Sequence, residues 1–310
     1  MTSPTISVVV PVYNGVDYLE KTVQSILKQS LRDFELVLIN DGSQDESQKL
    51  LERLSSEDSR VKVFHKENGG VACARNYGIG KSTGEFIAFC DQDDLWHTEK
   101  LAKQLPLFED SQVGLVYCGA VIEHTNLGKK SEPGFESKHR GDIFDQLIQQ
   151  NMITCCSAIA RKTMLQQCGG FDDDRSLMGV DDWHLWLKLA LICKADFVEE
   201  HLCTHVFHGD NYSLNDGKMH DAEIICLDKI FPLTITSGRS PNWNSIRRNI
   251  HLKYAQSYLY TSDFKLAADT YQRAYREQPS PSALIKWLIY RILPAPVLHF
   301  LQNQKRRIAR

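Results

Sequence analysis

The stretch Phe86-Ile87-Ala88-Phe89-Cys90-Asp91-Gln92-Asp93-Asp94 joins an apolar run of strand length to three carboxylates within four residues. Strand side chains alternate between two faces, so Asp91 and Asp93 point the same way if the strand extends that far. Two like charges side by side repel unless a cation or hydrogen-bond donors lie between them. Carboxylate oxygens suit Mg²⁺ or Mn²⁺. The stretch therefore predicts a strand that ends at a divalent-cation site, where such a cation can hold a phosphorylated ligand.

A second interpretation of the same carboxylates needs no ligand. Asp93 or Asp94 would cap a helix expected from Leu95 to Phe108, because carboxylates accept hydrogen bonds from the free N–H groups at a helix N-terminus. The other carboxylates would then be solvated. Both interpretations are compatible with this stretch taken alone.

Strand and helix patterns alternate over the first 120 residues. Residues 6–12 form a continuous apolar run, which is typical of a strand buried on both faces. Further strands are expected at residues 35–40, 61–65, 85–90 and 113–117. Helical segments are expected between them, at residues 16–29, 44–54 and 72–81. Strands that alternate with helices over short loops predict the α/β class, with a Rossmann-like, mostly parallel sheet flanked by helices.

Distinctive residue clusters follow each of the first four strands. They are Pro11-Val12-Tyr13-Asn14-Gly15, Asn40-Asp41-Gly42-Ser43, Glu67-Asn68-Gly69-Gly70 and Asp91-Gln92-Asp93-Asp94. Each cluster taken singly is typical of a turn. In open α/β sheets, however, ligands bind outside the carboxyl ends of the strands, where the strand order reverses. Four clusters on one edge of the sheet favour a shared binding site.

The composition restricts the class and the expected location of the protein. The 310 residues are 42% hydrophobic with a net charge of −3, which is typical of a globular protein and gives no electrostatic case for nucleic-acid binding. Nine cysteines without a C-x-x-C pair predict buried thiols in a reducing compartment. A strand pattern begins at Ile6 in place of a signal peptide, and no uninterrupted apolar segment reaches membrane-spanning length. We therefore expect a cytoplasmic protein.

The sequence after about Asn244 predicts helices. One tetratricopeptide-like helix pair is indicated by the spacing of Ala255, Tyr258, Phe264, Ala267, Tyr271, Ala274 and Pro279. A single pair cannot bury its own apolar face, so it should pack on another domain or on a partner. The last segment, Ala283 to Arg310, mixes apolar residues with a basic end. It predicts either an amphipathic segment in a membrane interface or a capping helix with a solvated basic end.

Together the motifs resemble those of the family 2 glycosyltransferases, which have the GT-A fold. The resemblance covers roughly residues 5 to 215. It rests, in this order, on the stretches from Ser7 to Gly15, Asn40 to Asp45, Gly70 to Ile79 and Gly84 to Asp94, and on Asp181-Asp182-Trp183. It implies inverting transfer of a sugar from a nucleotide-sugar, expected to be a UDP-sugar, to a hydroxyl of a glycan or lipid-linked acceptor. It also implies Mn²⁺ or Mg²⁺, which would neutralise the diphosphate leaving group.

The resemblance implies roles for individual residues of the nucleotide-binding half. Asp93 matches the metal-binding carboxylate of the family's D-x-D motif, and Asp91 would hold the ribose or help to position the metal. Asp41 matches the carboxylate that accepts a hydrogen bond from the base. Arg75 would meet phosphate or sugar oxygens, or else form an ion pair on a helix surface. The other expected nucleotide-sugar contacts are Pro11, Val12, Tyr13, Asn14, Asn68, Gly70 and Gln92.

Inversion requires a base on the face of the sugar opposite the leaving group. Asp182 matches the family's acidic residue before a Trp-containing helix, while Asp181 stands where the family more often has Glu. One of the two could also cap the helix. His208 would be a third metal ligand or a diphosphate contact. Relatives commonly have Arg at the position of Val206, so this phosphate contact is either missing here or replaced by His205.

The resemblance sets the expected domains and the competing functions. We expect a GT-A domain over residues 1–240, with a nucleotide-binding half at about 1–118 and an acceptor half at about 119–240, followed by a helical tail over 241–310. The expected process is synthesis of a polysaccharide, O-antigen or glycolipid, with possible peripheral contact to the inner face of the plasma membrane. A nucleotidyltransferase is disfavoured, because the loop Val12-Tyr13-Asn14-Gly15-Val16 has no basic residue to hold a triphosphate. A non-catalytic scaffold derived from a transferase is the remaining alternative.

Overall fold

A computed structural model describes residues 4–209 and 215–300 of the chain. The chain divides into two compact units, Met1–Tyr212 and Ser213–Arg310. Helix α8 (Asp216–Thr236) belongs to the second unit, although the sequence places it before the boundary expected near residue 240. The sequence-based expectations for residues 210–214 and 301–310 lie outside the described residues.

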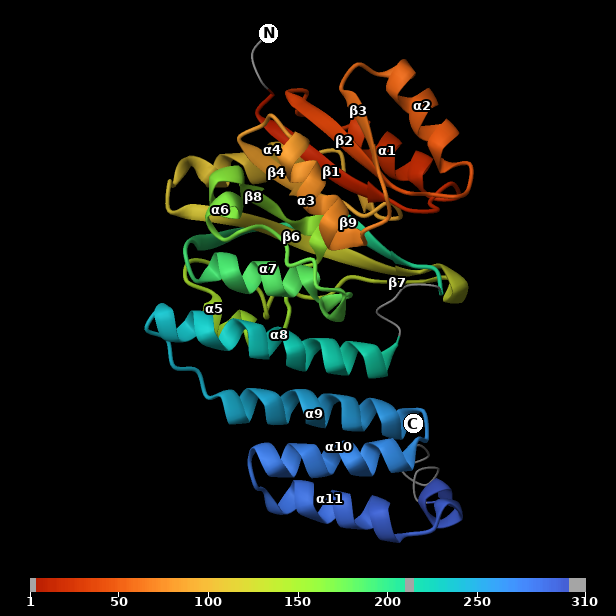
Figure 1. Ribbon diagram of the computed structural model, residues 1–310, viewed down its shortest axis with the longest axis vertical. Helices are drawn as coiled ribbons and strands as arrows, with labels where there is room; N and C mark the ends of the chain where they lie inside the picture. The colour runs from red at the N-terminus through yellow and green to blue at the C-terminus, as the bar shows by residue number, and fades with distance from the viewer. Residues whose placement is uncertain (1–3, 210–214, 301–310) are drawn as a thin grey trace. The chain divides into compact units, whose positions relative to one another are not determined.

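The first unit is built on a nine-stranded sheet with the order β3-β2-β1-β4-β8-β6-β9-β5, in which β7 pairs with β6. The strands are β1 (Ile6–Val12), β2 (Phe34–Asp41), β3 (Val61–Lys66), β4 (Phe86–Phe89), β5 (Leu95–Trp96), β6 (Val113–His124), β7 (Lys129–Ser131), β8 (Ile159–Arg161) and β9 (Lys194–Phe207). β1 pairs in parallel with both β2 and β4 (Figure 1). The strand order therefore reverses beside β1, which is where a ligand site is expected.

Helices flank this sheet and cover its apolar faces. They are α1 (Leu19–Leu27), α2 (Ser47–Glu57), α3 (Val71–Lys81), α4 (Lys100–Gln104), α5 (Phe144–Leu147), α6 (Lys162–Gln167) and α7 (Asp181–Ala190). β1 and β2 are buried along their whole length, as their uninterrupted apolar sequences predict. α1 is amphipathic and buries Leu19, Val23 and Ile26. The α/β class and the mostly parallel, helix-flanked sheet predicted from the sequence are confirmed.

The segment after β4 differs from the expectation in two ways. β4 ends at Phe89, and the carboxylates lie in a turn in which Asp94 N–H donates to the Asp91 carbonyl at 3.2 Å. The alternation rule therefore does not reach Asp91 and Asp93. The helix expected from Leu95 to Phe108 is wrong at its start, because Leu95–Trp96 pairs with β9 and α4 begins at Lys100. Local periodicity could not reveal a strand partner that lies more than a hundred residues away in the sequence.

The second unit consists of helices. α8, α9 (Trp243–Tyr260), α10 (Phe264–Glu277) and α11 (Pro281–Ile292) stack one after another in chain order (Figure 1). α9 and α10 form the helix pair that the sequence predicts, with Ala255, Tyr258, Ala267 and Tyr271 buried. None of the helices within residues 4–209 and 215–300 combines the length and apolarity needed to cross a membrane.

Candidate active site

The loop after β4 is tied to the loop after β1 by a side-chain amide. Gln92 Oε1 accepts from Tyr13 N–H at 2.9 Å, and Gln92 Nε2 donates to the Tyr13 carbonyl at 3.1 Å. Thr22 Oγ1 of α1 donates to the Gln92 carbonyl at 2.8 Å. These bonds fix the carboxylate-bearing turn at the carboxyl end of β1. Gln92 therefore holds the two loops together, whether or not it also contacts a ligand.

Asp93 meets a histidine from the far end of β9. Asp93 Oδ2 lies 2.8 Å from His208 Nε2, and the His208 ring stacks on Tyr18 with 4.5 Å between centroids. Burial raises the pKa of Asp93 to about 6, with further contributions from the charges of Asp94 and Asp91. The two residues expected to bind a metal thus lie side by side, in a region with an excess of negative charge.

Asp94 holds the strand that carries His208. Its carboxylate is fully buried and accepts from Val206 N–H at 3.0 Å, and it lies 3.0 Å from His205 Nδ1. Burial lowers the pKa of His205, but the hydrogen bond and the charge of Asp94 outweigh it and raise that pKa to about 9. Cys156 adds a third potential ligand atom within 4.8 Å of the other two. The sequence interpretation treated Asp94 only as a helix cap and missed this role, although the run of carboxylates was a signal for it.

Arg75 joins this loop to the acidic pair at the start of α7. Its guanidinium donates to Asp91 Oδ1 and to Asp181 Oδ2, both at 2.5 Å, and it lies over the ring of Phe171 at 5.2 Å. Arg75 is only 4% exposed. The ion pair is therefore buried, and the surface ion pair considered from the sequence is wrong. Asp91 and Asp181 bind one guanidinium although they are 90 positions apart in the sequence.

Asp182 lies next to this ion pair and is partly buried. Its Oδ1 accepts from Trp183 N–H at 2.6 Å and from Asn151 Nδ2 at 3.4 Å. Burial raises the pKa of Asp182 to about 7, and the charge of Asp181 adds to this shift. The N-cap residue of α7 is Val180, so neither Asp181 nor Asp182 occupies the N-cap position. Asp182 nevertheless satisfies one free N–H of the first turn of α7, that of Trp183.

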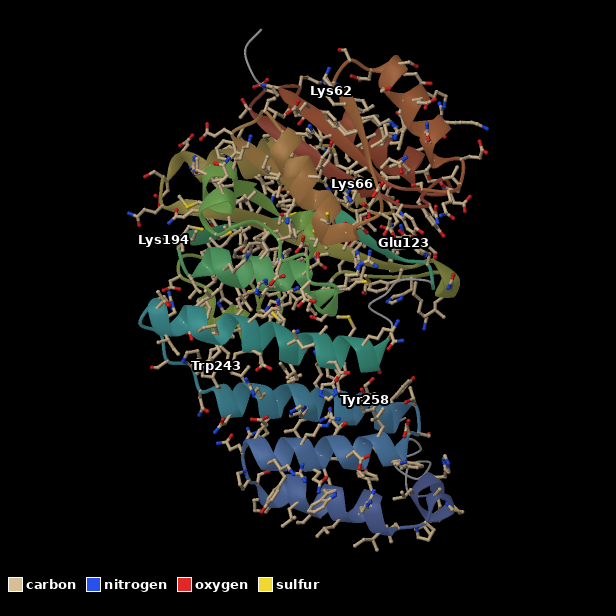
Figure 2. All side chains as sticks on the ribbon, in the orientation of Figure 1. Lys62, Lys66, Glu123, Lys194, Trp243 and Tyr258 are labelled. Atoms are coloured by element: carbon tan, nitrogen blue, oxygen red, sulfur yellow. The ribbon has the colours of Figure 1, made fainter. Side chains whose placement is uncertain are left out.

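Asp41 is held at the end of β2 by three hydrogen bonds. It accepts from Lys66 Nζ at 2.6 Å, from Gly69 N–H at 3.0 Å and from Gly70 N–H at 2.9 Å (Lys66 is labelled in Figure 2). Gly70 has φ +91°, a backbone conformation that favours glycine. Asn68 Nδ2 donates to the Asp41 carbonyl at 2.9 Å. A carboxylate has about four acceptor positions, so Asp41 retains capacity for one more donor.

The nucleotide-sugar contacts expected after β1 are only partly accessible. Pro11 and Val12 are buried within the sheet, whereas Tyr13 is 46% exposed. Asn14 adopts φ +48° and accepts from Gln44 N–H at 2.8 Å through its side chain. Tyr13 therefore presents the most surface to a ligand, and Asn14 shapes the loop.

A pocket opens at the N-terminus of α3. It is lined by Gly69, Gly70, Val71, Ala72, Asp173, Asp174, Arg175, Met178 and Asp181. Arg175 Nη2 approaches Asn68 Oδ1 at 3.5 Å. The free N–H groups of a helix N-terminus favour anions. The pocket thus adjoins both the Asp41 loop and the Arg75–Asp181 pair, and sequence reasoning did not predict the contribution of residues 173–178.

Helices flank the sheet, and carboxylates gather at the carboxyl ends of its strands, which is where ligands bind in open α/β sheets. The family model described as "Glycosyl transferase family 2" matches residues 7–169, which is more than half of the chain. The chain belongs to glycosyltransferase family 2 and is an enzyme of that type.

Curated relatives agree with this family. An uncharacterized glycosyltransferase of Rickettsia typhi is 30% identical over 229 residues, covering 71% of this chain and 70% of the relative. One from Haemophilus influenzae is 44% identical over 106 residues, 34% of this chain and 42% of the relative. The chain spans only 30% of a longer relative from Rickettsia conorii, to which it is 35% identical over 191 residues, 60% of this chain.

Solved structures share the fold. Residues 1–349 of Staphylococcus aureus TarS in complex with UDP-GlcNAc have a TM-score of 0.62 at 18% identity, covering 93% of this chain and 91% of that one. The mannosyltransferase PcManGT of Pyrobaculum calidifontis, in complex with GDP-Man and Mn²⁺, has a TM-score of 0.62 at 20% identity, covering 98% of this chain and 85% of that one. The GT-A-like architecture expected from the sequence is therefore confirmed.

Proposed function

We propose that the protein transfers a sugar, with inversion at the anomeric carbon, from a UDP-sugar to a hydroxyl of a glycan or lipid-linked acceptor. The process would be synthesis of a polysaccharide, O-antigen or glycolipid, on the cytoplasmic side of a membrane. One observation carries the proposal: Arg75 bonds both to Asp91 of the D-x-D loop and to Asp181 of the acidic pair. This supports a single site with a leaving-group side and an acceptor side.

The potential metal ligands on the leaving-group side of the site fit a divalent cation. Asp93 and His208 combine carboxylate and imidazole donors, which Mn²⁺ accepts more readily than Mg²⁺ does. A cation there would also relieve the repulsion among Asp91, Asp93 and Asp94. PcManGT, which shares the fold, binds GDP-Man with Mn²⁺. When bound, the metal would supply neutralisation of the charge that grows on the diphosphate.

We propose Asp182 as the base. A general base works best when its pKa lies near the operating pH, and burial raises the pKa of Asp182 to about 7. Arg75 would orient the neighbouring Asp181, and it would keep Asp91 ready to contact the ribose or the metal. A contact of Arg75 itself with phosphate or sugar oxygens stays part of the proposal.

For the nucleotide, Asp41 would use its remaining acceptor capacity for an N–H of the base, with Tyr13 against the base. Pro11, Val12, Asn14, Asn68, Gly70 and Gln92 would line or shape the same region. The acceptor would bind over residues 119–180. That UDP-GlcNAc is bound by TarS supports a UDP-sugar here, in line with the expectation from the sequence.

Turnover tests the proposal directly. The protein would be incubated with a panel of UDP-sugars and GDP-mannose, with Mn²⁺ or with EDTA, and release of the nucleoside diphosphate would be followed. A parallel thermal-shift screen reports binding, because a ligand that prefers the native state raises its stability. We expect the protein to bind a UDP-sugar and to release UDP from it, both in a Mn²⁺-dependent manner. Binding without release on any acceptor would instead favour the scaffold alternative, and neither binding nor release would refute both.

A further inference from the structure

Helix α11 exposes an apolar stripe on the face opposite to its packed face. It buries Ala283, and its Tyr290 ring stacks on Tyr271 of α10 with 5.9 Å between centroids. The exposed stripe consists of Ile285 (55% exposed), Leu288 (40%), Ile289 (38%) and Ile292 (70%). The spacing i, i+3, i+4, i+7 aligns these side chains along one side of the helix. α11 is therefore apolar on two faces, and only one of them is packed.

Three further exposed apolar side chains follow the end of α11 in the sequence. Leu293, Val297 and Phe300 are 36%, 42% and 62% exposed. Seven of the sixteen exposed large hydrophobic side chains among the described residues lie between residues 285 and 300. We call these seven residues the α11 patch. Soluble proteins scatter single exposed apolar residues, whereas a contiguous patch marks a binding surface.

The charge of the surrounding sequence identifies what this surface binds. No Asp or Glu follows Glu277, while six basic residues do: Lys286, Arg291, Lys305, Arg306, Arg307 and Arg310. Because the whole chain has a net charge of −3, the residues up to Glu277 carry −9 and the rest carry +6. At about 100° per residue, Lys286 and Arg291 lie on opposite flanks of the stripe. Lys286 Nζ lies 5.3 Å from the centroid of the Tyr271 ring, and the exposed Arg291 lies 3.7 Å from Asp269 of α10. An apolar stripe flanked by basic side chains is the pattern of a helix that lies in the interface of an anionic bilayer.

We propose that the α11 patch docks onto an anionic lipid surface, with α11 lying along it and Lys286 and Arg291 at the level of the headgroup phosphates. This goes beyond the proposed function, because it requires neither donor nor active site. A symmetric dimer formed through the same patch would bring two like-charged surfaces together, which is unfavourable. An acidic protein partner would satisfy the charges, but a row of exposed aliphatic side chains along one helix suits acyl chains better.

Flotation of the full chain with vesicles tests the inference. One set of vesicles is phosphatidylcholine alone, and the other contains equal parts of phosphatidylcholine and phosphatidylglycerol. We expect flotation with the anionic vesicles only, decreasing as salt is raised. The double variant Ile289→Asp/Ile292→Asp should lower the partition coefficient at least about tenfold. The double variant Arg306→Gln/Arg307→Gln should lower it about fivefold for each charge removed.

The matched control is Ile235→Asp, which changes an isoleucine of similar exposure (64%) on α8, outside the patch. It should float like the unmodified protein. No flotation with anionic vesicles at low salt would overturn the inference. A decrease in flotation of Ile235→Asp as large as that of Ile289→Asp/Ile292→Asp would also overturn it. A dimer that the Ile289→Asp/Ile292→Asp variant converts to a monomer, without lipid binding, would also overturn it in favour of a second copy. UDP release is measured on the same preparations. A protein that releases UDP but does not float contradicts only the lipid inference, and one that floats but releases no UDP contradicts only the proposed function.

Discussion

Asp93 Oδ2 and His208 Nε2 lie 2.8 Å apart, although the two residues are 115 positions apart in the sequence. The contact depends on the neighbouring carboxylate, because Asp94 accepts from Val206 N–H and so fixes the end of β9 just before His208. The two adjacent carboxylates therefore have different structural roles. One holds the backbone of β9, and the other meets the histidine that this strand delivers.

Replacing the proposed base should remove catalysis and leave donor binding. Asp182→Asn keeps the shape of the side chain but cannot accept a proton, so the transfer rate should fall by about 10²–10⁴-fold. The thermal shift caused by UDP-sugar and Mn²⁺ should persist. The exposed Glu199→Gln serves as the control and should retain full activity. Unchanged transfer by Asp182→Asn would remove this residue from the mechanism.

The pH dependence of transfer should follow the same carboxylate. The pKa of Asp182 is raised to about 7, and only the deprotonated form can act as a base. The rate should therefore fall about tenfold per pH unit below pH 7 and level off above it. Residual activity of Asp182→Asn should lack this inflection. An inflection near pH 4 in the unmodified enzyme would contradict the assignment.

The buried ion pairs of Arg75 should matter far more than those of an exposed arginine with the same number of partners. Arg75→Met leaves Asp91 and Asp181 without their cation, which should lower the free energy of unfolding by about 3–5 kcal/mol. Arg53 bridges Glu20 and Glu57, but its side chain is 46% exposed, so Arg53→Met should leave the free energy of unfolding nearly unchanged.

Urea unfolding of the two arginine variants measures this difference. Arg75→Lys should recover only part of the loss, because one ammonium group cannot span two carboxylates as a planar guanidinium does. Equal effects of Arg75→Met and Arg53→Met would show that the buried ion pair does not organise the site.

The helical unit should lose stability in weak acid. His220 Nε2 and His251 Nδ1 are buried 2.7 Å apart, and burial lowers both pKa values to about 4, with Arg273 and Lys253 adding to the shift for His220. A histidine whose pKa is lowered by folding stabilises the folded state at pH values above 6.5, its pKa in the unfolded chain. This stabilisation is lost as the pH falls from 6.5 towards 4. Glu277, 3.9 Å from His251, favours the charged form and opposes part of the effect.

The variant His251→Gln tests this pair, since glutamine does not titrate. Circular dichroism during thermal unfolding should show a shallower loss of stability between pH 6.5 and 4 than in the unmodified protein. An identical slope in the variant would mean that other groups, not the histidine pair, determine the acid sensitivity.

Much of the fold follows from local sequence pattern. β1 and β2 are mostly apolar, and α1 and α2 each have a clear apolar face, so the order of these elements predicts a parallel sheet. The pattern fails where an element depends on a distant partner. Leu95–Trp96 reads as the start of a helix but pairs with β9, and α8, with Pro232 in its interior, shows no clear period.

The site follows from sequence to a similar extent. The carboxylates from Asp91 to Asp94 stand out because like charges cluster at the end of a predicted strand, whereas Asp182 is indicated by the resemblance to the family. The partnership of Arg75 with Asp91 and Asp181 could not be predicted, because it joins three segments whose separation is fixed only by the folded sheet. The bond of Asp94 to Val206 was hidden for the same reason: one partner is a backbone group, which leaves no mark in the sequence.

Binding of Mn²⁺ in the presence of UDP, measured by calorimetry, tests the central claim most directly. The account predicts one Mn²⁺ per chain for the unmodified protein, and loss of that site in Asp93→Asn and in His208→Ala, with Glu52→Gln on α2 as the unaffected control. Mn²⁺ binding of unchanged stoichiometry and affinity in both site variants would contradict it.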